Sequence, residues 1–462
     1  MYRFYINNVD NDYHYSELIR VFMSDDDFEV ITITRNDFDN LPLSINSFVV
    51  NKTMSDDRDT IKKELYFLLQ HITGMTSDWG TLTGVRPLKL AFEIYHSLGD
   101  YDLTKDVLKE KYLISEKKIN LLIQILKYQL GHIFGKPSDK VGIYIGIPFC
   151  PTRCSYCSFA ANVAPEDDIK EYFNNLIKEI EYIGSLIIKN HTNIESIYIG
   201  GGTPTTLDDK QLEILINTIS RSFNINTSEI EFTVEGGRPD TITKSKLHAL
   251  SECGVSRISI NPQTMKNRTL ELIGRKHTSE DIETAYQLTS QFNFDVVNAD
   301  LIAGLPEEGL DDFKNSLVKT IELGANNITI HTLSVKRGSK IKDNDPEYYR
   351  HNTEIVANML KYAHEKLLEE GFYPYYIYRQ KHQIGALENV GYCKPDKHSI
   401  YNIRIMEEKQ TIIGLGAGAI GKVYYPNEDR LERIPNIANY QLYNERFDEI
   451  LKRKDYYYGG QK

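Results

Sequence analysis

Hydrophobic and polar residues alternate along the middle of the chain in a pattern that predicts strands separated by helices. Six short stretches are rich in Ile, Val, Phe and Tyr, and most of them end in Gly, Pro or Asn, as strands do. They span residues 142–148, 196–202, 230–237, 256–263, 294–306 and 327–334. Between them, apolar residues recur at three- and four-residue steps, as on one face of a helix. Strands that alternate with helices predict a parallel sheet built from βαβ units.

The number of these units bears on how the sheet closes. Six strands favour an open or partial barrel over a closed barrel, which has eight. Residues 140–340 are therefore predicted to form an α/β barrel domain.

A different pattern precedes the barrel and predicts a separate N-terminal α+β domain over residues 1–136. Strand-like runs at 28–34 and 46–51 come before several helices, the last of which is expected at 116–133. The stretch GKPSD, residues 135–139, has the composition of a linker.

Within this region the segment WGTLTGVRP, residues 79–87, combines the chain's one Trp with two Gly and an Arg-Pro pair. Proline suits the first turn of a helix. The segment is therefore interpreted as a tight turn before a helix that starts near Leu88.

Residues 341–462 are predicted to form a C-terminal α+β extension that closes the active site. The predicted elements are a helix at 347–370, strands at 372–379, 399–406 and 411–418, and a terminal helix at 436–453.

Composition and charge exclude some classes of function. The 462 residues include 54 Lys and Arg against 65 Asp and Glu, a net charge of −11. Nucleic acid is thus not expected as the main partner, because phosphate binding needs a basic surface. No basic-then-apolar signal sequence and no run of about 20 apolar residues is present, so we expect a cytoplasmic protein without a membrane span.

Three of the five cysteines lie together in GIPFCPTRCSYCSF, directly after the first predicted barrel strand. Cys150, Cys154 and Cys157 form a CxxxCxxC pattern. Thiolates are soft ligands that select zinc, copper(I) or iron–sulfur clusters. Structural zinc usually has four ligands in two pairs, and no second pair is present. Three cysteines on a cubane cluster would leave one iron open to a cofactor or substrate. A structural zinc site or inert cysteines are the alternatives.

Polar or glycine-rich features accompany the carboxyl ends of all six predicted strands, where barrel enzymes place their active sites. They are residues 150–157 after the first strand, GGGTP (200–204) at the second, Glu235, Gln263, Asp300 and His331 at the others.

The chain resembles the radical S-adenosylmethionine (SAM) superfamily, because that superfamily shares the CxxxCxxC pattern with an aromatic residue, here Tyr156, before its last cysteine. Further motifs resemble the oxygen-independent coproporphyrinogen III oxidase family, and most of all its coproporphyrinogen dehydrogenase (HemZ) branch. The strings are YIGGGTPT, VEGGRPD, INPQT, IGRKH, DLIAGLP, HTLSVKRGS, YRQKH, ENVGYC and IGLGAGAIGK, together with WGTLTGVRP.

The resemblance implies a partial (βα)6 TIM-like barrel and two cofactors. Cys150, Cys154 and Cys157 would hold a 4Fe–4S cluster, and SAM would bind its open iron. One electron would then cleave SAM to methionine and a 5′-deoxyadenosyl radical. An electron donor such as ferredoxin or flavodoxin is implied in the same way.

The resemblance also carries candidate cofactor contacts onto this sequence. Glycines let a backbone approach a ligand closely, acids accept hydrogen bonds, and arginine donates to a carboxylate. The candidates are Gly201, Gly202, Thr203, Glu235, Gln263, Arg275, Asp300, Gly416 and Ala417.

Gly416 and Ala417 lie in a GxGxxG match at 416–421. No helix pattern and no βαβ unit follow it, so a dinucleotide-binding fold is not predicted. The resemblance makes it a loop near the cofactor.

Two functions of different classes follow from the resemblance. The first is oxidative decarboxylation of two propionates of coproporphyrinogen III to vinyl groups, which gives protoporphyrinogen IX. The second is a haem-binding chaperone or carrier, because the best-characterised decarboxylating branch has a fourth cysteine where this chain has Phe159. A radical SAM enzyme for another tetrapyrrole or a lipid is a third alternative.

A porphyrinogen carries carboxylates and needs cationic partners. The candidates are Lys336, Arg337, Arg379, Lys381 and His382, and a solvated charged surface is the alternative for each.

Overall fold

The computed structural model describes residues 1–7, 12–33, 41–42, 44–51, 57–132, 139–157, 162–334, 348, 352–381 and 383–459. The chain divides into two compact units. Unit 1 comprises residues 1–127, 377–381 and 385–387, and unit 2 comprises residues 128–376, 382–384 and 388–462. Residues 133–138 and 335–347 lie outside the described residues, and the predicted domain boundaries near 136–140 and 340 stay predictions.

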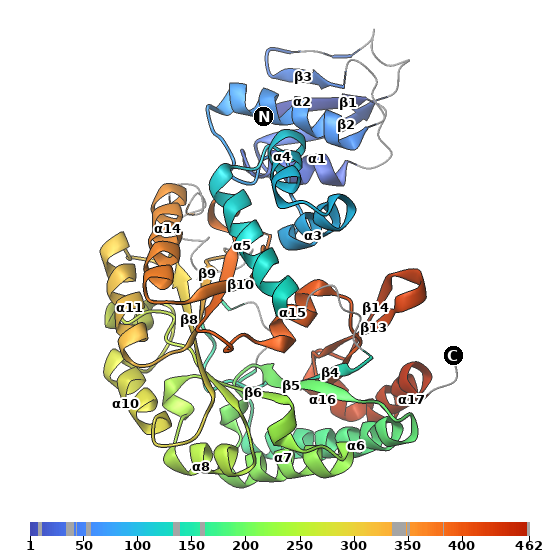
Figure 1. Cartoon of the computed structure of the whole chain (residues 1–462), viewed down its shortest axis with the longest axis vertical. Helices are drawn as coiled ribbons and strands as arrows, with labels where there is room; N and C mark the ends of the chain where they lie inside the picture. The colour runs from blue at the N-terminus through green and yellow to red at the C-terminus, as the bar shows by residue number, and fades with distance from the viewer. Residues whose placement is uncertain are drawn as a thin grey trace. The chain divides into compact units, whose positions relative to one another are not determined.

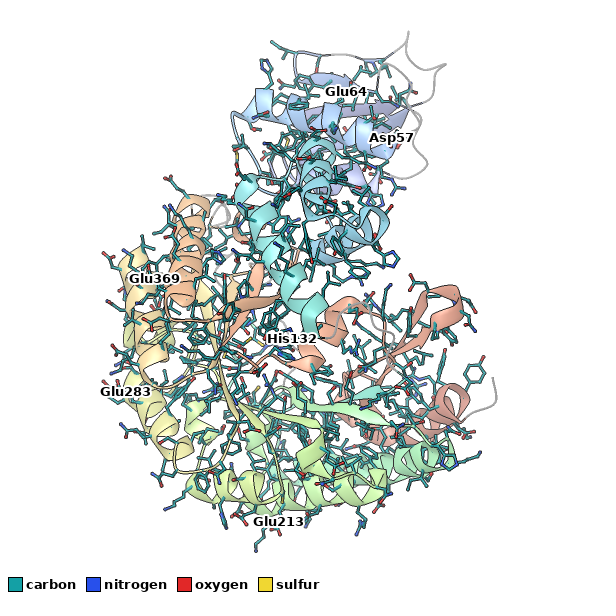
Figure 2. The ribbon with its side chains drawn as sticks, viewed as in Figure 1. Asp57, Glu64, His132, Glu213, Glu283 and Glu369 are labelled. Carbon is teal, nitrogen blue, oxygen red and sulfur yellow. The ribbon has the colours of Figure 1, made fainter. Side chains whose placement is uncertain are left out.

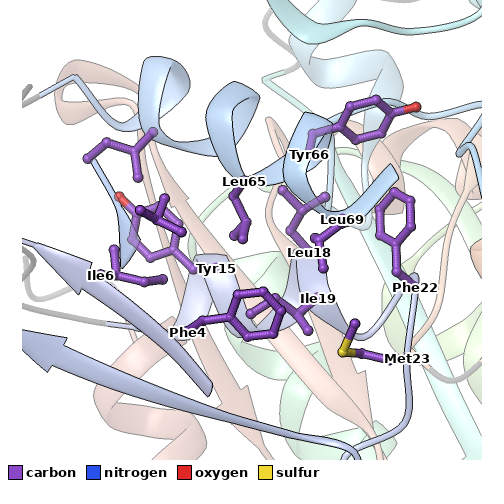
Figure 3. Close-up of a cluster of buried hydrophobic side chains, with 12 residues drawn as sticks. Phe4, Ile6, Tyr15, Leu18, Ile19, Phe22, Met23, Leu65, Tyr66 and Leu69 are labelled. Carbon is purple, nitrogen blue, oxygen red and sulfur yellow. The ribbon is translucent and has the colours of Figure 1, made fainter. Parts of the chain in front are cut away.

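Unit 1 contains a three-stranded parallel sheet in the order β2-β1-β3. The strands are β1 (Tyr2–Asn7), β2 (Phe28–Ile33) and β3 (Ser47–Val50). The sequence pattern predicted β2 and β3 but missed β1. The helices are α1 (Tyr13–Ile19), α2 (Arg58–Thr73), α3 (Pro87–Leu98), α4 (Tyr101–Tyr112) and α5 (Glu116–His132). Figure 3 shows the core of this unit, in which Phe4 and Ile6 of β1 meet Leu18 of α1 and Leu65 of α2.

Unit 2 is built on six parallel strands, β4 to β9, which confirm the six predicted strands and the partial barrel. They are β4 (Val141–Ile147), β5 (Ile194–Gly201), β6 (Glu231–Gly237), β7 (Arg257–Ile260), β8 (Val296–Ala303) and β9 (Asn327–Thr332). These strands form the middle of an 11-stranded sheet in the order β10-β11-β9-β8-β7-β6-β5-β4-β12-β13-β14. The outer strands are β10 (Tyr373–Tyr378), β11 (Asn389–Cys393), β12 (Ile412–Leu415), β13 (Ile420–Tyr425) and β14 (Arg430–Pro435).

Helices cover the outer face of the curved sheet in Figure 1. They are α6 (Glu166–Lys189), α7 (Asp209–Phe223), α8 (Lys244–Glu252), α10 (Ser279–Thr289), α11 (Leu310–Glu322) and α14 (Thr353–Glu369). The short helix α9 (Asn267–Leu272) follows β7. Their solvent-facing sides carry charged residues such as Glu213 and Glu369 (Figure 2). No helix in the described ranges is both long and apolar enough to span a bilayer.

The two faces of the barrel strands differ in chemistry, since successive side chains point to opposite sides. On β4, Ile143, Ile145 and Ile147 are fully buried, whereas Tyr144 between them is only half-buried. Tyr144 lies opposite Tyr198 of β5, and their rings are stacked 6.2 Å apart. The second face therefore presents polar and small residues, and it is this face that carries the candidate site.

The prediction of a strand at 399–406 is wrong, because these residues form helix α15 (Ile400–Glu407). The Ser399 side chain caps the helix by accepting the Asn402 N–H at 3.2 Å. Glu231, the first residue of β6, accepts the N–H groups of Ile400 and Tyr401 at 2.7 and 2.9 Å. A carboxylate at a helix N-terminus stabilises the helix. Tertiary contacts thus decide a segment whose short apolar run fits either structure.

The inner face of α15 packs at the amino ends of the barrel strands. Arg404 forms a two-point ion pair with Glu195 near the start of β5, at 2.9 and 3.2 Å, and it also pairs with Glu407 at 3.0 Å. Arg404 and Glu407 are almost completely buried. Helix α15 is therefore anchored to the starts of β5 and β6.

The other C-terminal predictions hold in part. Strands at 372–379 and 411–418 are confirmed as β10 and β12, and the predicted terminal helix divides into α16 (Tyr440–Glu445) and α17 (Phe447–Tyr458). The GxGxxG segment leads from β12 into β13, which pairs antiparallel with β14. An antiparallel hairpin in place of a helix confirms that this is not a dinucleotide-binding unit.

Candidate functional site

The three clustered cysteines lie on the loop after β4, and the end of β5 fixes the start of this loop. Phe149, just before Cys150, accepts the Thr203 N–H at 2.7 Å, and Ile147 accepts the Gly202 N–H at 2.8 Å. The Cys150 thiol lies 3.3 Å from the Thr203 hydroxyl. Cys150, Cys154 and Cys157 are all half-buried, so the thiols are sheltered and still reachable from the barrel mouth.

Two neighbouring loops brace the cysteine loop. Arg238, which is 2% exposed, donates to the Thr152 hydroxyl at 2.6 Å and holds Asp240 through two hydrogen bonds of 2.9 and 3.0 Å. On the other side, Ser155 N–H donates to Ile273 at 3.0 Å. The loop is therefore organised by contacts with neighbouring parts of the chain.

A strip of glycines continues from β5 toward the cysteines. A Cβ at Gly202 would lie 2.4 Å from the Phe149 carbonyl oxygen, and one at Gly200 would lie 2.8 Å from the Glu235 carboxylate. Gly201 has a φ of +110°, a conformation that favours glycine. These predicted glycines are thus required by close approach of backbone and side chains.

Glu235 on β6 is the central acid of the site. One carboxylate oxygen accepts the Tyr198 hydroxyl in a short hydrogen bond, and the other accepts the Gly201 N–H at 3.3 Å. Burial raises the pKa of Glu235 to about 7; the Tyr198 hydrogen bond opposes this increase, and nearby Asp300 adds to it. A carboxyl group with such a pKa gains most from a cationic ligand, because a positive charge offsets its loss of hydration.

The Tyr198 ring is held between other tyrosines. Tyr401 of α15 stacks on Tyr198 with ring centroids 4.5 Å apart, and Tyr144 lies 6.2 Å from both rings. The stack fixes the hydroxyl that binds Glu235.

In the strand order, Gln263 after β7 and Asp300 on β8 lie on the side of Glu235 away from the glycine strip. The Gln263 N–H donates to the Asp300 carbonyl at 2.9 Å, and Gln263 has the left-handed φ of +68°. The Asp300 carboxylate lies 3.5 Å from the His331 ring and accepts the Asn298 amide at 3.0 Å. Burial acts to raise the pKa of Asp300, but His331 and Asn298 outweigh it and hold the pKa below its usual range.

Arg275 follows α9 and lies beside the cysteine loop. It is 8% exposed and donates to the Asn261 carbonyl at 2.6 Å and to the Tyr156 hydroxyl at 3.2 Å. Its Nε is buried and has no hydrogen-bond partner in the part of the chain that the structure describes. One N–H donor of this guanidinium group is therefore left unused by the described residues.

Gly416 and Ala417 lie against the end of β4. A Cβ at Gly416 would lie 2.5 Å from the Gly146 carbonyl oxygen. The Gly416 N–H donates to Glu179 at 2.7 Å, and the Ala417 N–H donates to the Tyr172 hydroxyl at 2.9 Å. The loop thus reaches the same edge as the cysteine loop, although both peptide donors are bound within the protein.

Glu179 on α6 holds this loop, so its replacement by Gln is expected to destabilise unit 2 by about 3 kcal/mol. The reason is that Lys454, which is fully buried 3.6 Å from Glu179, would lose its counter-charge. Chemical denaturation measures the effect. Glu181→Gln on the same helix is the control, because its exposed pair with Arg221 is expected to contribute less than about 1 kcal/mol. Equal effects of the two substitutions would refute this role.

Two of the predicted substrate cations belong to unit 1, the others lie outside the described residues, and their role toward the substrate stays a prediction. Arg379 is 7% exposed within unit 1, where it donates to the carbonyls of Leu82 and Ala386 at 2.6 and 2.8 Å and lies 5.2 Å from the Trp79 ring. Lys381, also in unit 1, lies 3.4 Å from Glu17. Lys336, Arg337 and His382, as well as Phe159, lie outside the described residues.

Sequence reasoning missed several residues that shape the site. Tyr198 could have been found, because it lies two positions before Gly200 and so on the same face of β5. Arg238 is part of the VEGGRPD string, but nothing in that string indicates its contact with Thr152. Tyr401 was assigned to a strand, and only the position of α15 places it against Tyr198.

The residues present fit an iron–sulfur cluster with an adjacent amino-acid-like cofactor. Three soft sulfur donors share one loop, the glycine strip packs closely against the start of this loop, and acids and an arginine lie on the neighbouring strands and loops. Burial raises the pKa of the Cys150 thiol, an effect that metal binding reverses because ligands bind as thiolates. No three His, Cys, Asp or Glu side chains among the described residues are arranged around a single metal ion. In a cluster each cysteine binds a different iron, so that finding concerns single ions alone.

Comparison with known proteins gives consistent results. Residues 144–319 match the Radical SAM superfamily. The oxygen-independent coproporphyrinogen-III oxidase-like protein HemZ of Bacillus subtilis (strain 168) is 41% identical over 401 residues, which cover 86% of this chain and 80% of HemZ. The heme chaperone HemW of the same organism is 30% identical over 282 residues, covering 61% of this chain and 70% of HemW.

A solved structure shares the fold. Coproporphyrinogen III oxidase (HemN) from Escherichia coli, a radical SAM enzyme, superposes with a TM-score of 0.54 at 20% identity, covering 70% of this chain and 72% of HemN. The superfamily implies SAM and a 4Fe–4S cluster as cofactors. The chain therefore belongs to the radical SAM superfamily and, within it, to the oxygen-independent coproporphyrinogen-III oxidase-like family that includes HemZ.

Proposed function

We propose that this protein is an oxygen-independent coproporphyrinogen III dehydrogenase. It would oxidise two propionates of coproporphyrinogen III to vinyl groups and so form protoporphyrinogen IX in the cytoplasm. Each propionate would lose CO2, one hydrogen atom to the 5′-deoxyadenosyl radical and one electron to an acceptor. The observation that carries the proposal is the cysteine loop, which lies at one barrel edge with the glycine strip and Glu235, in a chain 41% identical to HemZ.

The cofactor sites follow from the chemistry of each side chain. Cys150, Cys154 and Cys157 would hold the cluster through their thiolates. Glu235 and Asp300 would accept hydrogen bonds from the ammonium and hydroxyl groups of SAM, and Arg275 would bind its carboxylate.

The remaining candidates act through shape and backbone. Gly201, Gly202 and Thr203 would let the ligand approach β5 closely. Gln263, and the loop of Gly416 and Ala417, would line the adenosine side. When bound, the cluster and SAM supply a 5′-deoxyadenosyl radical; the chain's own groups bind, orient and shield the reactants.

The proposed reaction requires a substrate and an electron donor as partners. The tetracarboxylate substrate needs cationic contacts, and an electron donor such as ferredoxin or flavodoxin would reduce the cluster.

A haem carrier is the second candidate function. Two observations favour it: HemW is 30% identical to this chain, and Phe159 stands where the decarboxylating branch has a further cysteine. Such a carrier would retain the cluster and bind haem without turnover.

Anaerobic reconstitution distinguishes the two functions. The reconstituted protein is supplied with dithionite, SAM and coproporphyrinogen III, and the vinyl product and 5′-deoxyadenosine are measured. We expect protoporphyrinogen IX, with two decarboxylations per product molecule. Deoxyadenosine without a vinyl product would exclude the dehydrogenase. Stoichiometric haem binding without turnover would support the carrier.

A further inference from the structure

The segment WGTLTGVRP has no part in the proposed reaction, yet it lies beside a buried lysine in unit 1. Lys62 of α2 is 8% exposed and shares the buried face of that helix with Ile61 and Leu65. Burial of an ammonium group without a counter-charge is unfavourable, and an apolar side chain would fill this position more stably. The presence of a lysine at this buried position therefore indicates that its positive charge has a function.

The Lys62 ammonium group is only partly satisfied within the protein. Its Nζ donates to the Thr83 hydroxyl at 3.3 Å. Among the described residues no carboxylate lies within ion-pair distance of it, and Thr83 is its one hydrogen-bond partner. An ammonium group has three N–H donors, so further acceptors can bind beside the 79–87 segment.

Charged groups of both signs lie around Lys62. Burial lowers the pKa of Lys62 to about 8; Asp59 opposes the decrease, whereas Arg58 and Arg379 add to it. Burial, Arg58 and Lys62 likewise lower the pKa of His14, against a smaller opposing effect of Glu17. A bound anion would stabilise the charged form of Lys62, which burial disfavours.

Unbonded backbone donors belong to Thr83, which binds the ammonium group, and to the two residues that follow it. The N–H groups of Thr83, Gly84 and Val85 donate to no acceptor in the part of the chain that the structure describes. A Cβ at Gly84 would meet only the Leu82 side chain, at 3.8 Å, so the space there is open. Helix α3 begins at Pro87, and its positive end adds to the field. These N–H groups are therefore free to donate to a ligand that binds beside Thr83.

We propose that Lys62, the Thr83 hydroxyl and the peptide N–H groups of residues 83–85 form a binding site for a phosphate group in unit 1. A tetrahedral oxyanion offers acceptor oxygens to several separate donors, whereas a planar carboxylate is matched better by the fork of an arginine. The occupant is either free phosphate or the phosphate group of a small molecule. This site is independent of the proposed reaction.

The first test measures phosphate binding to the full chain. Thermal unfolding and isothermal titration calorimetry are carried out in chloride buffer with added inorganic phosphate, and with acetate at matched ionic strength. We expect saturating phosphate to raise the melting temperature by roughly 1–3 °C, and acetate to raise it less. An equal effect of acetate would overturn the proposal, because it would reduce the effect to charge screening.

Substitutions locate the site. Lys62→Met is expected to keep or raise the melting temperature in chloride, since it removes a buried charge, and to weaken phosphate binding at least tenfold. Lys63→Met, on the same helix, is the matched control and is expected to bind phosphate as the unchanged chain does. A marked loss of stability in Lys62→Met without phosphate would show that the lysine is structural and would overturn the proposal. Unchanged phosphate binding in Lys62→Met would overturn it as well.

A third arm identifies the source of the phosphate group. Adenosine 5′-monophosphate is titrated under the same conditions. Tighter binding of the nucleotide than of inorganic phosphate, lost in Lys62→Met, supports a phosphorylated small molecule as the occupant. Equal or weaker binding supports the free ion. Binding of neither probe overturns the site.

Discussion

Replacement of Cys150 by Ala is expected to abolish both cluster assembly and SAM cleavage. Cys150 is the first thiol of the loop after β4 and lies 3.3 Å from the Thr203 hydroxyl. With two sulfur ligands left, the cluster loses one of its three protein anchors, and the open-iron arrangement can no longer form. After anaerobic reconstitution, iron should fall from about four per chain to well below one. Iron and sulfide analysis, the visible absorption of the cluster and 5′-deoxyadenosine formation measure the loss.

Cys253→Ala is the control for this experiment. Cys253 ends helix α8 and lies 3.9 Å from Asn217, with no other cysteine beside it in the described structure. Its replacement is expected to leave iron content and SAM cleavage unchanged. If Cys150→Ala retained iron and cleavage, or if the reconstituted wild-type chain carried zinc in place of iron and sulfide, the assignment of the three ligands would be wrong.

Replacement of Glu235 by Gln is expected to weaken SAM binding by roughly 10- to 100-fold, the effect of losing one charge-assisted hydrogen bond. The amide retains the size of the carboxyl group but offers no negative charge to the cation. Since the pKa of Glu235 is raised to about 7, its ionised form is unfavourable in the folded protein. The substitution is therefore not expected to lower the melting temperature at pH 8. Equilibrium binding to the reconstituted protein and thermal unfolding measure the two effects separately.

The pH dependence of SAM binding tests whether the ionised form of Glu235 is the form that binds SAM. Below about pH 7 the Glu235 carboxyl group is mostly protonated, so SAM affinity should fall as the pH decreases from 8 to 6. The Tyr198 hydroxyl favours the ionised form, and Tyr198→Phe should thus move the midpoint of this profile to higher pH. Tyr144→Phe is the matched control: its ring belongs to the same stack, and no shift is expected.

A second control separates binding from stability. Glu231 lies at the other end of β6 and caps helix α15 through the N–H groups of Ile400 and Tyr401. Glu231→Gln should lower the melting temperature and leave SAM affinity unchanged. A loss of SAM affinity in Glu231→Gln equal to that in Glu235→Gln, or a pH profile that Tyr198→Phe does not move, would contradict the assignment of Glu235.

Local sequence patterns were sufficient to predict the barrel strands and the loop that carries the three cysteines. Strands β4 to β9 agree with the six predicted strands to within a few residues at their ends, because buried parallel strands are continuous apolar runs that differ clearly from the helices between them. The same local signals failed for 399–406 and missed β1, β11, β13 and β14. A short apolar run fits a strand or one face of a helix equally well, and its neighbours decide between them.

The sequence by itself determined the chemistry that is available: three soft ligands on one loop, glycines beside them, and acids at the ends of the following strands. These features are local, since residue type and spacing alone specify them. The tertiary structure alone decided which groups act on one another. It forms the hydrogen bond of the Tyr198 hydroxyl to Glu235 and stacks the Tyr401 ring on Tyr198. It also forms the hydrogen bonds of Arg238 to Thr152 and of Lys62 to Thr83. Each of these contacts joins different parts of the fold. The shifted pKa values of Glu235 and Lys62 follow from burial, and burial results from the packing of several segments together.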